Sequence, residues 1–245
     1  LEENILAQEA LISVESGIVD VHKLMDYFEY RLKENNGVLS CNSEVIGIEK
    51  NSGTYRITVK NDDGSFFSFK SRVLINSAGL SSDKLSEMAG IKDEKYKIHY
   101  CKGEYFIVNN GRGKINRLIY PVPDKKLVGL GIHATIDMAG EIRLGPNAFY
   151  VDELNYDVDE SYRDMFFNSA RLYLPFLRKE DLHPGFAGIR PKLQGPGEDY
   201  RDFVIKHEYE KGCDGLINLI GIESPGLTCA PAIARYVGNI VNEIL

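Results

Sequence analysis

The feature that most constrains the fold is a strand–turn–helix pattern near the end of the chain. Residues 216–222 form an apolar, β-branched run of strand length. Pro225 and Gly226 then predict a sharp turn, because proline fixes φ and glycine tolerates angles that other residues resist. A strand that turns into a helix directs unpaired N–H groups outward, which suits a negatively charged ligand, although an ordinary βα unit has the same pattern. The helix is predicted from residue 230 to the end, with an apolar face of Ile233, Tyr236, Val237, Ile240, Val241 and Leu245.

Length and composition exclude several classes of protein. A chain of 245 residues can form one large domain or two closely associated ones. Its net charge of −7 argues against nucleic-acid binding, and no apolar run approaches the roughly 18 residues of a membrane span. The four cysteines contain no CxxC pair and the five histidines have no metal-ligand spacing, so we expect neither a disulfide framework nor a metal site. Such cysteines suit a reducing compartment, and we expect a cytoplasmic protein.

The first 92 residues predict alternating helices and strands. Asp20 is expected to cap a helix that ends at Asn36-Gly37, with an apolar face of Val21, Leu24, Met25, Phe28 and Leu32. Strands are predicted at 38–41 and 44–49, a hairpin at 55–69, a buried strand at 72–76 and a helix at 82–88.

From about residue 97 the sequence becomes rich in predicted strands, with one helix at 159–173. The strands are predicted at 97–108, 118–120, 126–135, 141–144, 186–190 and 203–207. The pattern therefore predicts an α/β (α+β) fold, in which a βα part (residues 1–92 and 208–245) contains a mainly β insertion (residues 93–207).

A dinucleotide-binding fingerprint is formally present at residues 129–134, which fit G-x-G-x-x-A. The fingerprint requires a helix that opens at the glycines. Here Leu130, Ile132 and Ala134 alternate with other residues, which predicts a strand, so we reject the match. The sequence contains no other fingerprint of this kind, no P-loop and no G-x-S-x-G motif.

Several motifs in the same order strongly resemble the L-2-hydroxyglutarate dehydrogenase/oxidase family. They are residues 102–106 (KGEYF), 119–124 (IYPVPD), 127–135 (LVGLGIHAT), 142–148 (IRLGPNA) and 222–228 (IESPGLT). The resemblance begins near residues 16–19 and covers most of the chain. It implies a flavoenzyme of the D-amino-acid-oxidase type, which uses FAD to oxidise a hydroxy acid to a keto acid.

The chain departs from this family in one respect. Family members carry a glycine-rich FAD fingerprint at the N-terminus, and this sequence has none. The chain therefore resembles the C-terminal portion of such an enzyme, truncated or encoded by a split gene, with an incomplete FAD-binding part and a substrate-binding insertion. We expect it to bind FAD weakly or not at all by itself, and to need the missing N-terminal segment or a companion subunit.

The resemblance also implies roles for two residues. Arg190, in the run GIRP, occupies the place where related oxidases hold the substrate carboxylate, and a guanidinium can bind a carboxylate through two parallel hydrogen bonds. His133 is the candidate base that removes the hydroxyl proton, because histidine titrates near neutral pH. The alternatives are a surface arginine and a histidine that is hydrogen-bonded within the sheet.

Cofactor and substrate contacts are implied at further positions. The turn after residue 222 would place N–H groups at the pyrimidine edge of the flavin, which gains negative charge on reduction. The alternative for each strand end is an ordinary turn, and for each tyrosine simple core packing. The implied cofactor residues are Val45, Ala78, Gly79, Pro225, Gly226, Leu227 and Thr228, and the implied substrate residues are Tyr105, Tyr120 and Arg190.

The sequence therefore predicts the FAD-dependent oxidation of a small 2-hydroxy acid, similar to L-2-hydroxyglutarate, by an enzyme that is cytoplasmic or peripheral to a membrane. Two alternatives remain open. One is an amine or glycerol-3-phosphate oxidoreductase of the same fold. The other is a non-catalytic subunit that binds a partner.

Overall fold

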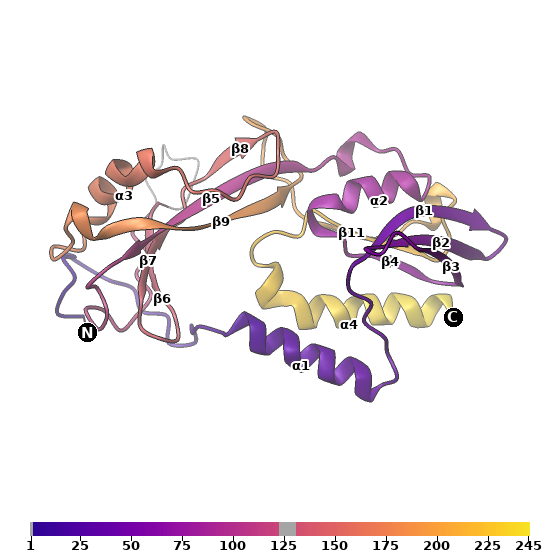
Figure 1. Ribbon diagram of the computed structural model, residues 1–245, viewed down its shortest axis with the longest axis horizontal. Helices are drawn as coiled ribbons and strands as arrows, with labels where there is room; N and C mark the ends of the chain where they lie inside the picture. The colour runs from indigo at the N-terminus through magenta and orange to yellow at the C-terminus, as the bar shows by residue number, and fades with distance from the viewer. Residues whose placement is uncertain (1, 123–130) are drawn as a thin grey trace. The chain divides into compact units, whose positions relative to one another are not determined.

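The computed structural model describes residues 2–122 and 131–245. They form two compact units, of which unit 1 comprises residues 1–39, 102–149 and 154–189 and unit 2 comprises residues 40–101, 150–153 and 190–245. Sheets and helices are mixed along the chain (Figure 1), which confirms the predicted α/β class. The predicted cofactor-binding and substrate-binding parts stay a prediction, because the units are defined by packing and not by ligands.

The elements are as follows. Unit 1 contains α1 (Val21–Glu34), β6 (His133–Ile136), β7 (Ile142–Gly145) and α3 (Arg163–Ala170). Unit 2 contains β1 (Ser43–Asn51), β2 (Thr54–Asn61), β3 (Phe66–Ser71), β4 (Leu74–Asn76), α2 (Ser82–Met88), β10 (Val204–His207), β11 (Leu216–Ile220) and α4 (Gly226–Ile244). Residues of both units form β5 (His99–Val108), β8 (Phe149–Val151) and β9 (Leu182–Lys192).

In unit 2, β11 lies between β10 and β4 in a three-stranded sheet. It is antiparallel to β10 and parallel to β4, and Asn218 pairs with Asn76. Leu216 and Ile217 point to opposite faces of β11 and both are buried, as expected of a strand in a parallel sheet. Because β4 and β11 are parallel, the turns that follow them leave the same edge of this sheet.

A second sheet of unit 2 is an antiparallel meander of β1, β2 and β3 (Figure 1). Tyr55, Ile57 and Val59 alternate along β2 and are buried, which confirms the predicted hairpin. Burying each large apolar side chain stabilises the fold by about 1.5–3 kcal/mol. Phe67 and Phe69, on the neighbouring strand β3, remain 43% and 47% exposed.

The core of unit 1 packs α3 against strands β5, β6 and β7. Phe106 on β5 and Phe166 on α3 are fully buried, with ring centroids 4.7 Å apart. Ala134, Ile142 and Leu144 complete the contact from the sheet. The predicted strand at 126–135 is confirmed from His133 onward, and its first part lies outside the described residues.

The helix predicted after Asp20 is present as α1, and the Asp20 side chain accepts a hydrogen bond from Lys23 N at 3.1 Å. None of its residues is buried, so its predicted apolar face has no partner that buries it among the described residues. The predicted strand at 38–41 is wrong, since these residues form no strand. The predicted helix at 159–173 is shorter, with a 3-10 turn at Glu160–Tyr162 before α3.

Candidate functional site

Two segments predicted to approach the flavin leave the same edge of one sheet in unit 2. Residues 77–79 follow β4, and residues 221–225 follow β11. Since these strands are parallel neighbours, both segments lie beyond their carboxyl ends. In open α/β sheets this is the edge where ligands bind. The structure thus brings Ala78 and Gly79 to the same edge as Pro225 and Gly226.

The N-terminus of α4 is uncapped by any side chain. The helix begins at Gly226 and not at the predicted residue 230, so Leu227 and Thr228 belong to its first turn. N–H groups in the first turn have no acceptor within the helix, and together they carry partial positive charge. Leu227 is 51% exposed. This end of α4 therefore fits the edge of a flavin that becomes negative, worth roughly 0.3–1 kcal/mol.

The turn before α4 is closely packed and anchored to β9. A Cβ atom on Gly226 would lie 2.4 Å from Ile222 Cγ2, so only glycine fits there. Glu223 forms an ion pair with Lys192 at 2.7 Å, and these side chains are only 9% and 20% exposed. The ion pair joins the end of β9 to the turn that leads into α4.

Arg190 lies on β9, two residues before Lys192, and therefore on the same face of the strand. Its residue is half-buried, and its Nη1 atom is buried without a hydrogen-bond acceptor among the described residues. A buried guanidinium nitrogen without an acceptor is costly, since the unmade hydrogen bond is not replaced by water. An anion bound at Arg190 would supply the acceptor.

In unit 1 the structure brings His133 together with Tyr120. The Tyr120 and His133 rings lie 4.2 Å apart between centroids. His133 pairs with Gly145 across β6 and β7, and a Cβ on Gly145 would lie 2.7 Å from Tyr105 Cδ1. His133 is only 7% exposed, whereas Tyr120 is 57% exposed. The candidate base thus sits beside Tyr120, whereas Tyr105 lies on β5, with β7 between it and His133, and stacks on Phe186 at 4.5 Å.

The rejection of the fingerprint at residues 129–134 is supported where the chain is described. Gly131 has a φ of +79°, and a strand begins at His133 instead of a helix. Residues 129 and 130 lie outside the described residues.

Val45, predicted near the adenosine, lies on β1 at an irregularity of the pairing with β2. The register shifts between Val45 and Gly47. Its role stays a prediction.

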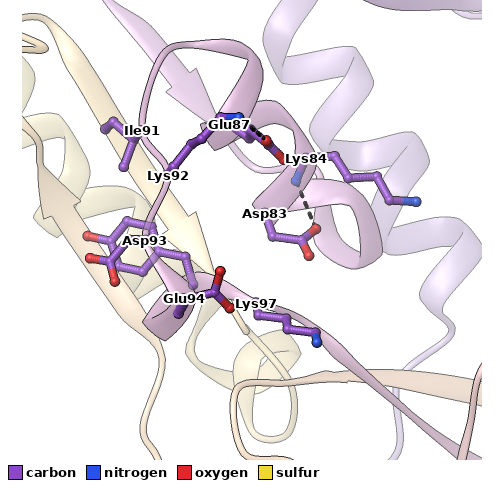
Figure 2. A pocket seen from close by; sticks show the side chains of 9 residues that line it. Asp83, Lys84, Glu87, Ile91, Lys92, Asp93, Glu94 and Lys97 are labelled. Carbon is purple, nitrogen blue, oxygen red and sulfur yellow. Dashed lines mark hydrogen bonds and ion pairs between the residues drawn. The ribbon is translucent and has the colours of Figure 1, made fainter.

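Unit 2 contains a hollow of about 400 Å³, lined by α2 and the segment that follows it. Figure 2 shows the side chains that line it. Its charged side chains are of both signs, and Lys92 pairs with Glu87 at 3.1 Å. No predicted site residue lines it. We therefore assign the site to the sheet edge and not to this hollow.

Sequence reasoning missed two groups of polar residues. The sequence did not indicate the ion pair between Lys192 and Glu223, because the two residues are 31 positions apart. Asn76 and Asn218 could have been noticed in the sequence, since each is an amide within a short apolar strand. Among the described residues no cluster of His, Cys, Asp or Glu could hold a metal ion. Of the helices in the described ranges, none has the length and apolar character to cross a membrane.

The family model of FAD dependent oxidoreductases named DAO matches residues 2–240. The chain is 31% identical to the mitochondrial L-2-hydroxyglutarate dehydrogenase of Arabidopsis thaliana, over 98% of the chain and 57% of that protein. It is 30% identical to a glycerol 3-phosphate dehydrogenase of Caloramator mitchellensis, over 89% of the chain and 43% of that protein. The chain thus spans about half the length of these relatives.

Two solved structures share the fold. One is the FAD-bound, dithionite-reduced L-α-glycerophosphate oxidase of Mycoplasma pneumoniae, with a TM-score of 0.70, 28% identity, and coverage of 86% of this chain and 53% of that chain. The other is L-proline dehydrogenase of P. horikoshii, with a TM-score of 0.71, 19% identity, and coverage of 91% and 55%.

Proposed function

The chain belongs to the DAO family of FAD-dependent oxidoreductases, and from this we propose that it is part of an enzyme that oxidises a small 2-hydroxy acid, similar to L-2-hydroxyglutarate, to the 2-keto acid. The chemistry that FAD supplies when bound is acceptance of a hydride from the substrate carbon. The α4 N-terminus and the 77–79 turn would hold its flavin end.

The observation that carries the proposal is the buried Nη1 atom of Arg190 without an acceptor. A carboxylate offers two oxygens in the geometry of the guanidinium fork. Lys192, on the same face of β9, is already neutralised by Glu223. Arg190 is thus the cation of this face that is left to bind an anion, and a single positive charge favours a carboxylate over a doubly charged phosphate ester.

His133 is proposed to take the proton of the substrate hydroxyl on an imidazole nitrogen. Burial of its ring beside Tyr120 limits access of water to that nitrogen. Tyr105 and Tyr120 would position the substrate. Each role is proposed for the residue separately.

Glycerol 3-phosphate oxidation is the second candidate. It is favoured by the Caloramator relative and by the likeness to the Mycoplasma oxidase. An amine substrate has only a likeness of fold in its favour. A substrate screen that includes L-2-hydroxyglutarate, glycerol 3-phosphate and proline separates these candidates.

Arg190→Ala, made in the complete protein, tests the function. Loss of two charge-assisted hydrogen bonds of about 1.5–3 kcal/mol each is expected to raise KM for the 2-hydroxy acid by about a hundredfold or more. The matched control is Arg56→Ala, an exposed arginine of the same unit. An unchanged KM would remove Arg190 from the site, and no turnover of any 2-hydroxy acid by the wild type would refute the proposed substrate class.

The complete enzyme is further proposed to include a polypeptide that pairs with the free edge of β4. Leu74 N–H donates to the carbonyl oxygen of Gly215, the residue directly before β11. Because the backbone N–H and C=O groups of successive strand residues point to opposite sides, those of Ile75 point away from β11. Among the described strands β4 lies at the end of its sheet, and Ile75 is 43% exposed. A strand that carries the missing FAD fingerprint would cover this edge and supply the helix N-terminus for the pyrophosphate.

Flavin content tests this partner. The 245-residue chain alone is expected to purify with little or no FAD. Ile75→Pro removes the outward N–H of an edge strand, so it should lower FAD content, and it should lower the melting temperature more in the complete protein than in the chain alone. Val38→Pro, exposed and outside any strand, is the control. Full flavin occupancy of the chain alone, or equal effects of Ile75→Pro in both forms, would exclude the partner.

A further inference from the structure

Two asparagines are buried side by side on the parallel strands of unit 2. Asn76 ends β4 and Asn218 lies opposite it on β11, with exposures of 2% and 0%. An amide in an apolar sheet is costly unless all its polar atoms are paired. The partners of these amides therefore explain why the strands carry them.

Asn76 holds the segment that follows β4. Its Nδ2 donates to Ser82 O at 2.7 Å and to Asn218 Oδ1 at 2.9 Å. Its Oδ1 accepts from Ala78 N at 3.2 Å. One side chain thus fixes both the middle and the end of the 76–82 segment, which contains the flavin-facing residues of the proposed function.

Asn218 connects this segment to a buried carboxylate. Its Nδ2 donates to Ser86 Oγ at 3.0 Å and to Glu208 Oε1 at 2.9 Å. Glu208 is fully buried, and the same Oε1 accepts from Tyr96 OH at 2.6 Å. Lys211 Nζ lies 3.6 Å from the other oxygen of Glu208.

The amide groups in this series of hydrogen bonds can be oriented in only one way. An ionised carboxylate accepts and never donates, so Asn218 must present Nδ2 to Glu208 and Oδ1 to Asn76. Asn76 must then present Nδ2 to that oxygen. Its own Oδ1 is left to accept from Ala78 N–H. The backbone partners of Asn76, Ser82 O and Ala78 N–H, require the same orientation, so the Glu208 carboxylate and the turn after β4 support one arrangement of both amides.

We propose that Glu208 and Asn218 are positioning residues for the flavin, which act through Asn76 to hold Ala78 and Gly79 in their bound conformation. Neither residue touches the cofactor. The proposal rests on the proposed function, because only that function makes the 77–79 turn a flavin contact. We call the three side chains of Glu208, Asn218 and Asn76 the amide relay.

The test replaces a carboxylate by an amide, or an amide by a carboxylate, within the amide relay, so that donors and acceptors change while the side chains keep their shape. Glu208→Gln removes the charge to which Asn218 Nδ2 donates, and Asn218→Asp places two carboxylates together without a donor. Each single variant is expected to speed hydrogen exchange at Ala78 N–H in this chain by about tenfold, and to weaken FAD binding by the complete protein by about tenfold. The double variant Glu208→Gln/Asn218→Asp restores a donor opposite an acceptor at every step. It is expected to return both quantities to within about threefold of the wild type.

Tyr55→Phe is the matched control. It removes a hydroxyl bonded to Asp214 O at 2.8 Å in the same unit and leaves the relay intact. It should change neither exchange at Ala78 nor FAD affinity, even where its effect on unfolding equals that of the single variants. The proposal is overturned if Tyr55→Phe acts like them, if they leave both quantities unchanged, or if the double variant fails to recover. A wild type that binds no FAD would refute the proposed function, while exchange at Ala78 would still decide whether the relay holds the turn.

Discussion

Among the described residues each unit fully buries one glutamate, and the two carboxylates are held in different ways. In unit 1, Glu104 is paired directly with Lys102 at 2.9 Å, and these side chains are 1% and 8% exposed. In unit 2, Glu208 accepts hydrogen bonds from the neutral donors Tyr96 and Asn218, and its cation Lys211 is more distant. Glu104 depends mainly on one close cation, besides a long hydrogen bond from Asp159 N–H at 3.4 Å, whereas Glu208 depends on several neutral donors.

The difference predicts how each unit responds to a lost partner. A buried ion pair that loses one member leaves an uncompensated charge, whereas a carboxylate with several donors loses only a part of its stabilisation. The Lys102 ammonium also donates to the Asp157 carbonyl and lies 5.8 Å from the centre of the Phe149 ring. The stabilisation of the buried carboxylate in unit 1 therefore comes mainly from Lys102, whereas in unit 2 it is shared among several residues.

The largest effect is expected for Lys102→Met. It should destabilise unit 1 by about 3–5 kcal/mol, because Glu104 would stay buried and charged without its cation. Urea unfolding followed by hydrogen exchange in unit 1 measures this. The double variant Lys102→Met/Glu104→Gln should recover most of the loss, and Lys33→Met, at an exposed pair on α1, should cost no more than about 0.5 kcal/mol. A loss below 1 kcal/mol for Lys102→Met would contradict the assignment of Lys102 as the main partner of Glu104.

Tyr96→Phe is expected to have an intermediate effect. Glu208 would keep its bond from Asn218, so unit 2 should lose about 1–2 kcal/mol, measured by urea unfolding at pH 7. Burial and the hydrogen bond to Glu208 raise the pKa of Tyr96. A raised pKa of an acid gives stability that is present below its unfolded value, near 10, and is lost as pH rises through the folded value.

The wild type should therefore lose stability in unit 2 above about pH 10, and Tyr96→Phe should lack that component. Identical alkaline unfolding curves for the two proteins would show that Tyr96 is not held by Glu208. Tyr236→Phe, at an exposed tyrosine of the same unit, serves as the control.

Local sequence signals predicted the elements whose causes are local. The helix cap at Asp20 and the buried alternation from Tyr55 to Val59 need only neighbouring residues. The start of α4 was predicted too late, at residue 230, whereas the helix begins at Gly226 and contains Pro231.

The polar contacts of the candidate site could not be predicted in the same way. Asn76 and Asn218 are 142 residues apart, and only the pairing of β4 with β11 brings them together. Lys192 and Glu223 are 31 residues apart and meet through the turn into α4. The family resemblance predicted which turns face the ligand, but the partners that hold those turns come from residues distant in the sequence that only the folded structure brings together.

The smallest effect is expected for Asp93→Asn, at the outer end of the unit 2 network. Lys211 donates to Asp93 at 2.7 Å, and this hydrogen bond, together with one from Lys95 N, holds the pKa of Asp93 below its usual value. Both side chains are partly exposed, so the loss at pH 7 should be about 0.2–1 kcal/mol. A lowered pKa gives stability that is present above the unfolded value, near 3.9, and is lost as pH falls through the folded value. The difference between wild type and Asp93→Asn in urea unfolding should therefore shrink as pH is lowered below about 4, and a difference that stays constant down to pH 2 would show that the pair contributes through packing and not through charge.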